Sequence, residues 1–314
     1  MKNKLPVNSY KKTRSYQRKE ATLFYLYISP WLIGFICLTL GPMLFSLWLS
    51  ISDASLGVTG NFIGFKNYAD MFTNDKLFLT SLFNTFYYAF VSIPLGLILA
   101  FFLALLLNLK LKGIGIFRTI FYLPSVVAGV AVILLWGWMF NADYGLINYS
   151  LSRIGIAGPH WLSDPNWAMP AIIFMSLWNV GGSMLIFLAG LQGVPQELYE
   201  SAEIDGANGW RRTLKITLPI LSPVVFFNLI MGIIGGFQVF TQVYVLTNVP
   251  NSSVGGPLNS TYVYALHIFR NAFNYLRMGY GAALAWILFV IILGFSIVVI
   301  ISRTRWVYTE EGGD

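Results

Sequence analysis

The sequence predicts an all-α integral membrane protein, and three observations lead to that fold class. Hydrophobic residues make up 56% of the 314 residues and charged residues only 11%, with a mean hydropathy of +0.66. Soluble domains contain about 25% charged residues, so this chain has too little charge to cover a water-exposed surface. The other two observations are a series of long uncharged apolar runs and a one-sided distribution of the basic residues.

Six apolar runs are each long enough to cross the roughly 30 Å of hydrocarbon in a bilayer. They are residues 21–49, 81–107, 119–140, 168–192, 216–246 and 278–301. None of these runs contains Asp, Glu, Lys, Arg or His, so we expect each to be a transmembrane helix. The first run is about twice as long as the apolar part of a secretory signal, and no small-residue cleavage site follows it. We therefore expect it to be an uncleaved anchor.

The lysines and arginines predict which side of the membrane each loop occupies. With a cytoplasmic N-terminal tail, the cytoplasmic segments hold Lys2, Lys4, Lys11, Lys12, Arg14, Arg18, Lys19, Lys110, Lys112, Arg118, Arg211, Arg212, Lys215, Arg303 and Arg305. The outer loops hold only Lys66, Lys76, Arg153, Arg270 and Arg277. Cytoplasmic loops are enriched in Lys and Arg, so both termini are expected in the cytoplasm. This distribution accounts for the net charge of +7 without a nucleic-acid partner.

The predicted spans lack the groups that several other classes of membrane protein need. An ion-coupled carrier keeps an ionisable residue at membrane depth, which argues against a stand-alone secondary transporter or channel. A membrane enzyme would need an acid–base or metal constellation, whereas His160 and His267 lie far apart in outer loops and are expected to be ordinary loop residues. The single Cys37 allows no internal disulfide, and no GxxxxGK[ST] phosphate loop is present. We expect no catalytic residue, metal or cofactor on this chain, so the energy for any pumping comes from another polypeptide.

Uncharged polar residues do occur inside the predicted spans. They are Asn84, Asn179, Asn228, Gln238, Thr241 and Gln242. In lipid such groups face either a neighbouring helix or a water-filled cavity, and the residues alone leave both interpretations open. Gln238 and Gln242 are one turn apart among aromatic residues, and Trp178 precedes Asn179. Aromatic faces beside uncharged donors and acceptors suit a sugar ring better than a metal ion or a strongly ionic solute.

The second cytoplasmic loop, residues 193–219, has an unusual composition. Pro195 favours the start of a helix, and the glutamates that follow are stabilised in its first turns by the helix dipole. Ala202 and Gly206 are four residues apart, which gives the helix a small-residue face, and Asn208 with Gly209 is expected to end it. A solvated helix would not explain an acidic, small-faced segment on the basic side of the membrane. A docking helix for a cytoplasmic partner explains both properties.

The same loop carries a long motif. It comprises Glu200, Ser201, Ala202, Asp205, Gly206, Ala207, Thr213, Ile216, Leu218 and Pro219. This pattern resembles the EAA loop of the membrane subunits of binding-protein-dependent ABC importers, with Ser201 for the usual Ala and Thr213 where Phe is common. The outer segments 140–148 and 255–261 resemble that family's outer loops, in the carbohydrate-uptake group of maltose- and glycerol-phosphate-type permeases. Residues 249–254 look like an insertion relative to it.

The resemblance implies a type I ABC importer permease core and a set of partners. A second homologous permease subunit, expected to be a different chain, would complete the solute path in a prokaryotic plasma membrane. Two ATPase subunits would bind ATP and Mg²⁺, and an extracellular binding protein would deliver a mono-, di- or oligosaccharide. A glycerol phosphate or polyol remains an alternative solute. An ABC exporter is disfavoured, because exporters usually need no such short docking motif and often fuse their own ATPase.

The resemblance also implies a division of the chain and two groups of site residues. The divisions are a basic tail 1–20, a first helix and outer loop 21–80, a five-helix permease core 81–302 containing the loop 193–219, and a tail 303–314. The ATPase-coupling residues would be Glu200, Ser201, Ala202, Asp205, Gly206 and Ala207. The solute path would include Trp178, Asn179, Phe237, Gln238, Thr241 and Gln242.

Overall fold

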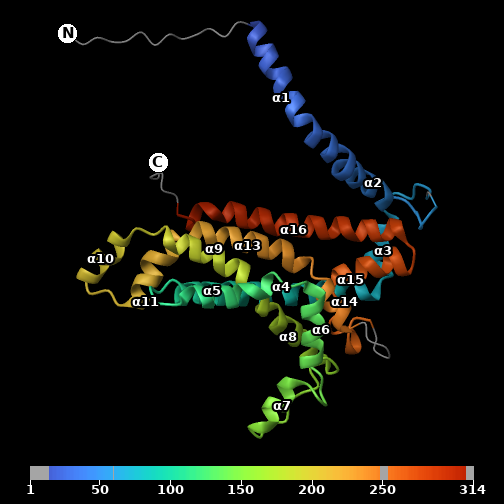
Figure 1. Cartoon of the computed structure of the whole chain (residues 1–314). Coiled ribbons are helices and arrows are strands. Elements are labelled where there is room, and N and C mark those ends of the chain that lie inside the picture. Colours follow the sequence, from blue (N-terminus) through green and yellow to red (C-terminus); the bar gives the residue numbers. More distant parts are fainter. Residues whose placement is uncertain (1–13, 59, 248–253, 309–314) are drawn as a thin grey trace.

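Long helices lie side by side in the computed structural model, which describes residues 14–58, 60–247 and 254–308 (Figure 1). The bundle consists of α4 (Lys76–Leu107), α5 (Ile114–Tyr122), α9 (Gly181–Gln192), α13 (Ser222–Phe237) and α16 (Met278–Trp306). In the described residues the only β pairing is two isolated bridges, Ser52 with Phe62 and Ser55 with Val58. The all-α class is confirmed.

The remaining helices extend from this bundle. At one end of it lie α10 (Gln196–Ile204), α11 (Gly209–Arg212), η4 (Thr213–Thr217) and α12 (Leu218–Ile220). At the other end lie α3 (Lys66–Thr73), α14 (Thr241–Thr247), η5 (Pro257–Asn259), α15 (Tyr264–Phe269) and η6 (Arg270–Asn274). A side arm contains α6 (Gly129–Met139), α7 (Leu146–Arg153) and α8 (Pro165–Ser176). The N-terminal segment contains α1 (Arg14–Phe35), η1 (Ile36–Leu40) and α2 (Gly41–Ser50).

Four of the predicted spans are long apolar helical segments. These are Lys19–Ser50, Lys76–Leu107, Ser222–Thr247 and Met278–Trp306, and each is long and apolar enough to cross a membrane. The second begins earlier than the apolar run suggests because Asp75 caps it, accepting hydrogen bonds from the backbone nitrogens of Leu77 and Phe78 at 2.9 and 3.1 Å.

The third and fourth predicted spans are each broken in the middle. Ile114–Ser125 meets Gly129–Met139 at 93°, and Pro165–Asn179 meets Gly181–Gln192 at 46°. Pro124 lies at the first break, where it lacks a backbone N–H and restricts the residue before it. The prediction of six spans therefore holds when each bent pair is counted as one span.

Close approach at the second break depends on Gly181. A Cβ atom on Gly181 would lie 2.5 Å from the carbonyl oxygen of Phe121 and 2.9 Å from the Cα of Tyr122. The start of α9 thus packs directly on the backbone at the end of α5. This contact joins the two bent spans where their helices are interrupted.

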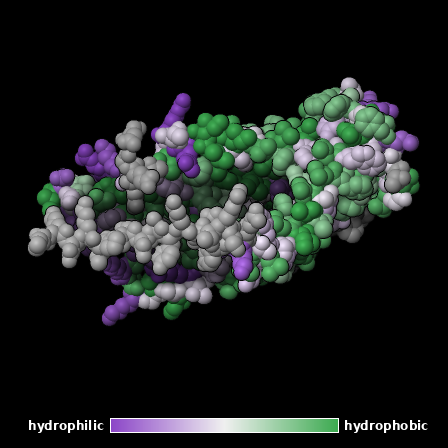
Figure 2. Space-filling view, turned by 90° about the horizontal axis from the view of Figure 1, so that it is seen from above, coloured by the Kyte–Doolittle hydropathy of each residue, from purple (hydrophilic) through white to green (hydrophobic). Residues whose placement is uncertain are grey.

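The N-terminal segment stands apart from the rest of the molecule (Figure 1). None of the most apolar window of Lys19–Ser50 is buried, and the bundle reaches the segment only near α2, where Trp286 donates to the hydroxyl of Ser46 at 3.2 Å. Figure 2 shows hydrophobic residues over most of the middle of the face seen from above, with hydrophilic residues toward its ends. This surface pattern is the one expected for a chain surrounded by lipid.

Candidate functional site: a cavity at the helix breaks and a docking helix

A cavity of about 570 Å³ lies where the two bent spans meet α4, α13 and α14. Its polar and aromatic lining comprises Tyr88, Ser92, Ser125, Ser176, Trp178, Asn179, Ser183, Asn228 and Gln242. None of its lining residues, all of which are in the described part, is charged. Interrupted helices leave backbone groups unpaired, and such backbone is tolerated at membrane depth where it lines a cavity. The breaks therefore explain why the cavity lies here.

Glycines bring α13 close to α4 along one wall of this cavity. Cβ atoms on Gly232 and Gly236 would each lie 3.0 Å from side-chain atoms of Ile93. Small residues at such a crossing allow two helices to pack closely without a large side chain between them. The wall position of α13 is thus fixed by its packing on α4.

The predicted path residues divide into two groups. Trp178, Asn179 and Gln242 line the cavity, whereas Phe237, Gln238 and Thr241 are not among its lining residues. Phe237 is 2% exposed, and its ring centroid lies 5.2 Å from that of Phe86 in an aromatic cluster that joins α4, α13 and α16. The roles of all six residues in transport stay a prediction.

The break between α13 and α14 accounts for this division. The sequence suggests one helical face that contains both Gln238 and Gln242, but α13 ends at Phe237 and α14 begins at Thr241. Gln238 follows α13 as its C-cap with an exposed side chain, and Gln242 alone reaches the cavity. The periodicity argument therefore fails where the helix is interrupted.

Sequence reasoning missed the hydroxyl residues of the cavity. Tyr88, Ser92, Ser125, Ser176 and Ser183 line it, and all are in otherwise apolar runs. The signal that could have found them is the helix-breaking sequence in two spans, Pro124 in one and Gly181–Gly182 in the other.

Trp178 is held at the cavity by a second tryptophan. Its ring centroid lies 5.8 Å from that of Trp136, with an angle of 75° between the planes. Trp136 is 5% exposed and also packs edge to face on Phe174 at 5.6 Å. Aromatic pairs favour this geometry, so Trp136 orients the exposed face of Trp178.

The predicted docking segment forms the helix α10 at one end of the bundle (Figure 1). The helix ends at Ile204, and the left-handed conformation of Gly206, with φ of +72°, turns the chain away. Asn208 then starts α11 by accepting a hydrogen bond from the nitrogen of Arg211 at 2.8 Å. Contrary to expectation, Asn208 thus begins the next helix, and the turn at Gly206 ends the first one.

The coupling candidates offer an open surface on and just after α10. Glu200, Ser201, Asp205 and Gly206 are exposed, while Ala202 and Ala207 are half-buried. The carboxylate of Glu200 accepts a hydrogen bond from the amide of Gln196 at 2.9 Å. Ile204, which the motif did not single out, is 88% exposed. An exposed apolar side chain beside carboxylates is compatible with a protein partner, but the role of these residues stays a prediction.

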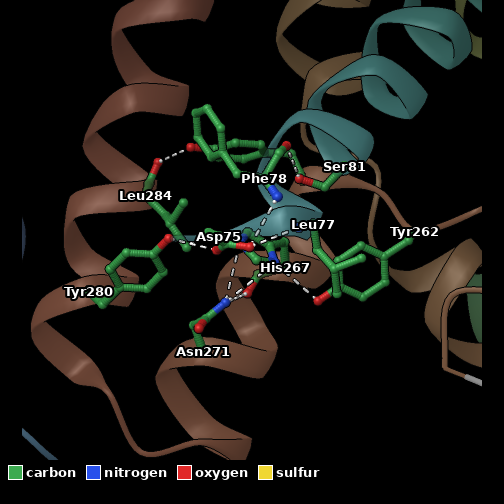
Figure 3. A network of polar contacts seen from close by, with 10 residues as sticks. Asp75, Leu77, Phe78, Ser81, Tyr262, His267, Asn271, Tyr280 and Leu284 are labelled. Carbon is green, nitrogen blue, oxygen red and sulfur yellow. Dashed lines mark hydrogen bonds and ion pairs between the residues drawn. The ribbon is translucent and has the colours of Figure 1, made fainter. Parts of the chain in front are cut away.

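A buried polar network joins the opposite end of α4 to α15 and α16 (Figure 3). Oδ2 of Asp75 lies 2.8 Å from Nε2 of His267 and accepts a hydrogen bond from the hydroxyl of Tyr280 at 2.6 Å. Nδ1 of His267 lies 3.1 Å from the hydroxyl of Tyr262. His267 is 2% exposed in α15, so the expectation of an ordinary loop histidine is wrong for this residue.

The network keeps His267 neutral and Asp75 charged. Burial lowers the pKa of His267 despite the attraction of Asp75. Burial alone would raise the pKa of Asp75, but the hydrogen bond from Tyr280 and the interaction with His267 outweigh it and lower that pKa. The neutral imidazole therefore donates from Nε2 to the carboxylate and accepts from Tyr262 at Nδ1. No group of three or more metal-ligating side chains occurs in the residues that the structure describes.

Comparison with known proteins places this architecture in one class, the membrane component of a transport system. Residues 74–305 match the model of the family described as binding-protein-dependent transport system inner membrane component, and the chain belongs to this family. It is a multi-pass membrane protein and an ABC importer permease.

Its relatives include the probable ABC transporter permease protein YesP of Bacillus subtilis, which is 43% identical and covers 97% of each chain. The trehalose/maltose transport system permease protein MalF of Thermococcus litoralis is 37% identical over 91% of this chain and 95% of that protein. A solved bacterial ABC transporter involved in the import of alginate shares the fold with a TM-score of 0.80, at 24% identity over 93% of this chain and 99% of that one.

Proposed function

We propose that this chain moves a carbohydrate delivered by an extracellular binding protein and is not itself an enzyme. The observation that carries the proposal is the uncharged cavity at the breaks of the two bent spans. Hydroxyl and amide groups can exchange hydrogen bonds with the hydroxyls of a sugar, and the exposed face of Trp178 can stack on its ring. The relatives named for sugar transport support the same solute class.

The uncharged lining of the cavity favours a carbohydrate over a glycerol phosphate. A phosphate group in a membrane-depth cavity needs cationic partners, because moving an ion out of water without them is costly. This chain offers none among the residues that line the cavity. A phosphorylated solute would depend entirely on cations of the second permease subunit.

The proposed assembly contains four kinds of chain in a prokaryotic plasma membrane. This permease pairs with a second, different permease, and both of its termini lie in the cytoplasm, as the distribution of basic residues favours. α10 docks on one of two ATPase subunits, which bind ATP and Mg²⁺. The binding protein meets the opposite end of the bundle, where α3, α14 and α15 lie.

Affinity purification in a mild detergent tests the assembly. The tagged chain should bring down an ATPase and a second, non-identical permease, which mass spectrometry identifies. If the chain is recovered alone, in a detergent that preserves other transporter complexes, the proposed assembly is wrong.

The binding protein that belongs to the complex then tests the solute class. Calorimetry with maltose, trehalose, lactose, arabino-oligosaccharides and glycerol 3-phosphate should detect binding of a sugar. Tight binding of glycerol 3-phosphate with no binding of any sugar would contradict the carbohydrate assignment while leaving the assembly intact.

A further inference from the structure

The side chain of Tyr199 joins α10 to the segment that leads into α13. Its hydroxyl lies 2.9 Å from Oγ1 of Thr217, the last residue of the π-helix η4. Thr217 is 2% exposed, and its Oγ1 donates to the carbonyl oxygen of Arg212 at 3.5 Å. Either hydroxyl can donate in the pair of Tyr199 with Thr217, which is shorter than the contact of Thr217 with Arg212.

A second contact between α10 and the following segment is exposed to water. Oε2 of Glu203 lies 3.3 Å from a guanidinium nitrogen of Arg212, with side chains that are 74% and 30% exposed. Surface ion pairs of this kind contribute little, because water and salt screen the charges. The pair of Tyr199 with the buried Thr217 is therefore the firmer of the two connections.

The chain continues directly from Thr217 to the wall of the cavity. α12 and α13 follow η4, and Asn228, Met231 and Gly232 of α13 line the cavity. Gly232 also packs closely on Ile93 of α4, so this part of α13 forms one wall of the cavity. A displacement of η4 along α13 would therefore reach the lining residues.

We propose that the Tyr199–Thr217 pair is the joint that transmits movement of α10 to the cavity wall formed by α13. Tyr199 is thus a positioning residue for energy coupling. The proposal rests on the proposed function, in that α10 is the helix on which the ATPase docks. Besides the pair, α10 is connected to η4 through the turn around Gly206, whose φ is +72°, through α11 and through the exposed ion pair.

The test measures how strongly ATP changes access to the cavity. The complex of this chain with its second permease, ATPase and binding protein is reconstituted in liposomes, with Cys37→Ser as background and Ser183→Cys as a reporter in the cavity lining. The rate of labelling by a membrane-impermeant maleimide is measured with and without ATP, Mg²⁺ and vanadate. This readout needs no knowledge of the transported sugar.

In the parent complex ATP should change the labelling rate. Tyr199→Phe should reduce the ATP-driven shift between the two states about fivefold, which is the equilibrium change that one average hydrogen bond produces. Thr217→Val should do the same, and the double variant should be no worse than either single one, because both remove one interaction.

Two matched variants separate the joint from general damage. Thr217→Ser keeps the hydroxyl and should retain the ATP response. Thr213→Val removes a hydroxyl on the same π-helix that bonds only the carbonyl of Gly209 at 3.0 Å, and it should leave the response unchanged. The amount of ATPase that co-purifies should be equal in all variants.

Five results would overturn the joint. A full ATP response in Tyr199→Phe would do so, as would additive losses in the double variant or an equal loss in Thr213→Val. Loss of the ATPase from the Tyr199→Phe complex would assign Tyr199 to docking instead. A parent complex without bound ATPase would overturn the proposed function as well, so the two failures are distinguishable.

Discussion

Gly181 and Gly182 provide a sharp test of how the two bent spans are held together. A Cβ atom on Gly181 would lie 2.5 Å from the carbonyl oxygen of Phe121 and 2.9 Å from the Cα of Tyr122. Both are backbone atoms that cannot rotate away, so Gly181→Ala must push the end of α5 from the start of α9. A Cβ atom on the neighbouring Gly182 would meet nothing within 4 Å, so Gly182→Ala fits without displacement.

The expected free energies of unfolding follow from these distances. Overpacking of a well-packed contact costs about 1–3 kcal/mol. Replacing a helical glycine by alanine in open space gains about 0.5–1 kcal/mol, because alanine loses less backbone entropy on folding. Gly181→Ala should therefore be less stable than Gly182→Ala by roughly 1.5–4 kcal/mol.

Unfolding by sodium dodecyl sulfate in mixed micelles, followed by circular dichroism, measures this difference. The variants add the same methyl group to adjacent residues, so they differ only in what that group meets. If Gly181→Ala is as stable as Gly182→Ala, the close contact between α5 and α9 is not a feature of the folded protein. The argument that places the cavity at the joined breaks would then be refuted as well.

Three further perturbations have defined outcomes. Stability should fall as the pH drops below about 6.5, the ordinary pKa of histidine. The reason is that the pKa of His267 is lowered in the folded protein, so at this pH the unfolded chain binds more protons than the folded one. His267→Gln should remove this dependence, as measured by thermal unfolding between pH 8 and 5. Phe237→Ala should lose about 3–5 kcal/mol of stability, because its side chain is buried. Trp178→Ala, at an exposed position, should keep its stability and lower uptake of the identified sugar. Equal unfolding midpoints of the two variants would contradict the packing role of Phe237. Glu200→Arg should leave membrane insertion intact and reduce the ATPase recovered by affinity purification, and normal recovery with normal uptake would rule out its coupling role.

The sequence was sufficient to predict the helical spans because hydrocarbon tolerates no unpaired backbone and few charges. Residues 81–107 and 278–301 were correctly recognised as helices for this reason, although capping by Asp75 and the continuation to Trp306 lie outside the apolar runs. The docking segment that contains Glu200 could be predicted from the sequence because its charged residues and its glycine lie close together along the chain. Residues 249–253 of the suggested insertion lie outside the described residues.

The cavity could be predicted only in part because it depends on where helices break. Trp178, Asn179 and Gln242 stood out as polar or aromatic residues in apolar runs, and they do line it. Gln238 stood out equally but does not line the cavity, since the helix is interrupted after Phe237 and the chain changes direction there. The partnership of Asp75 with His267 spans 192 residues of sequence, and no local pattern indicates it.

The uncharged cavity also bears on where the energy for transport enters. A solute changes the balance of two conformations only by the difference in its affinity for them. Hydrogen bonds of uncharged groups in membrane proteins contribute about 0.6–2 kcal/mol each, whereas reversing an equilibrium from 1:99 to 99:1 needs about 5.5 kcal/mol. A sugar that exchanged two such bonds between the states would supply less than that. Under the proposed function the remainder enters where the ATPase docks on α10, and the proposed joint between α10 and η4 determines how much of it reaches the cavity.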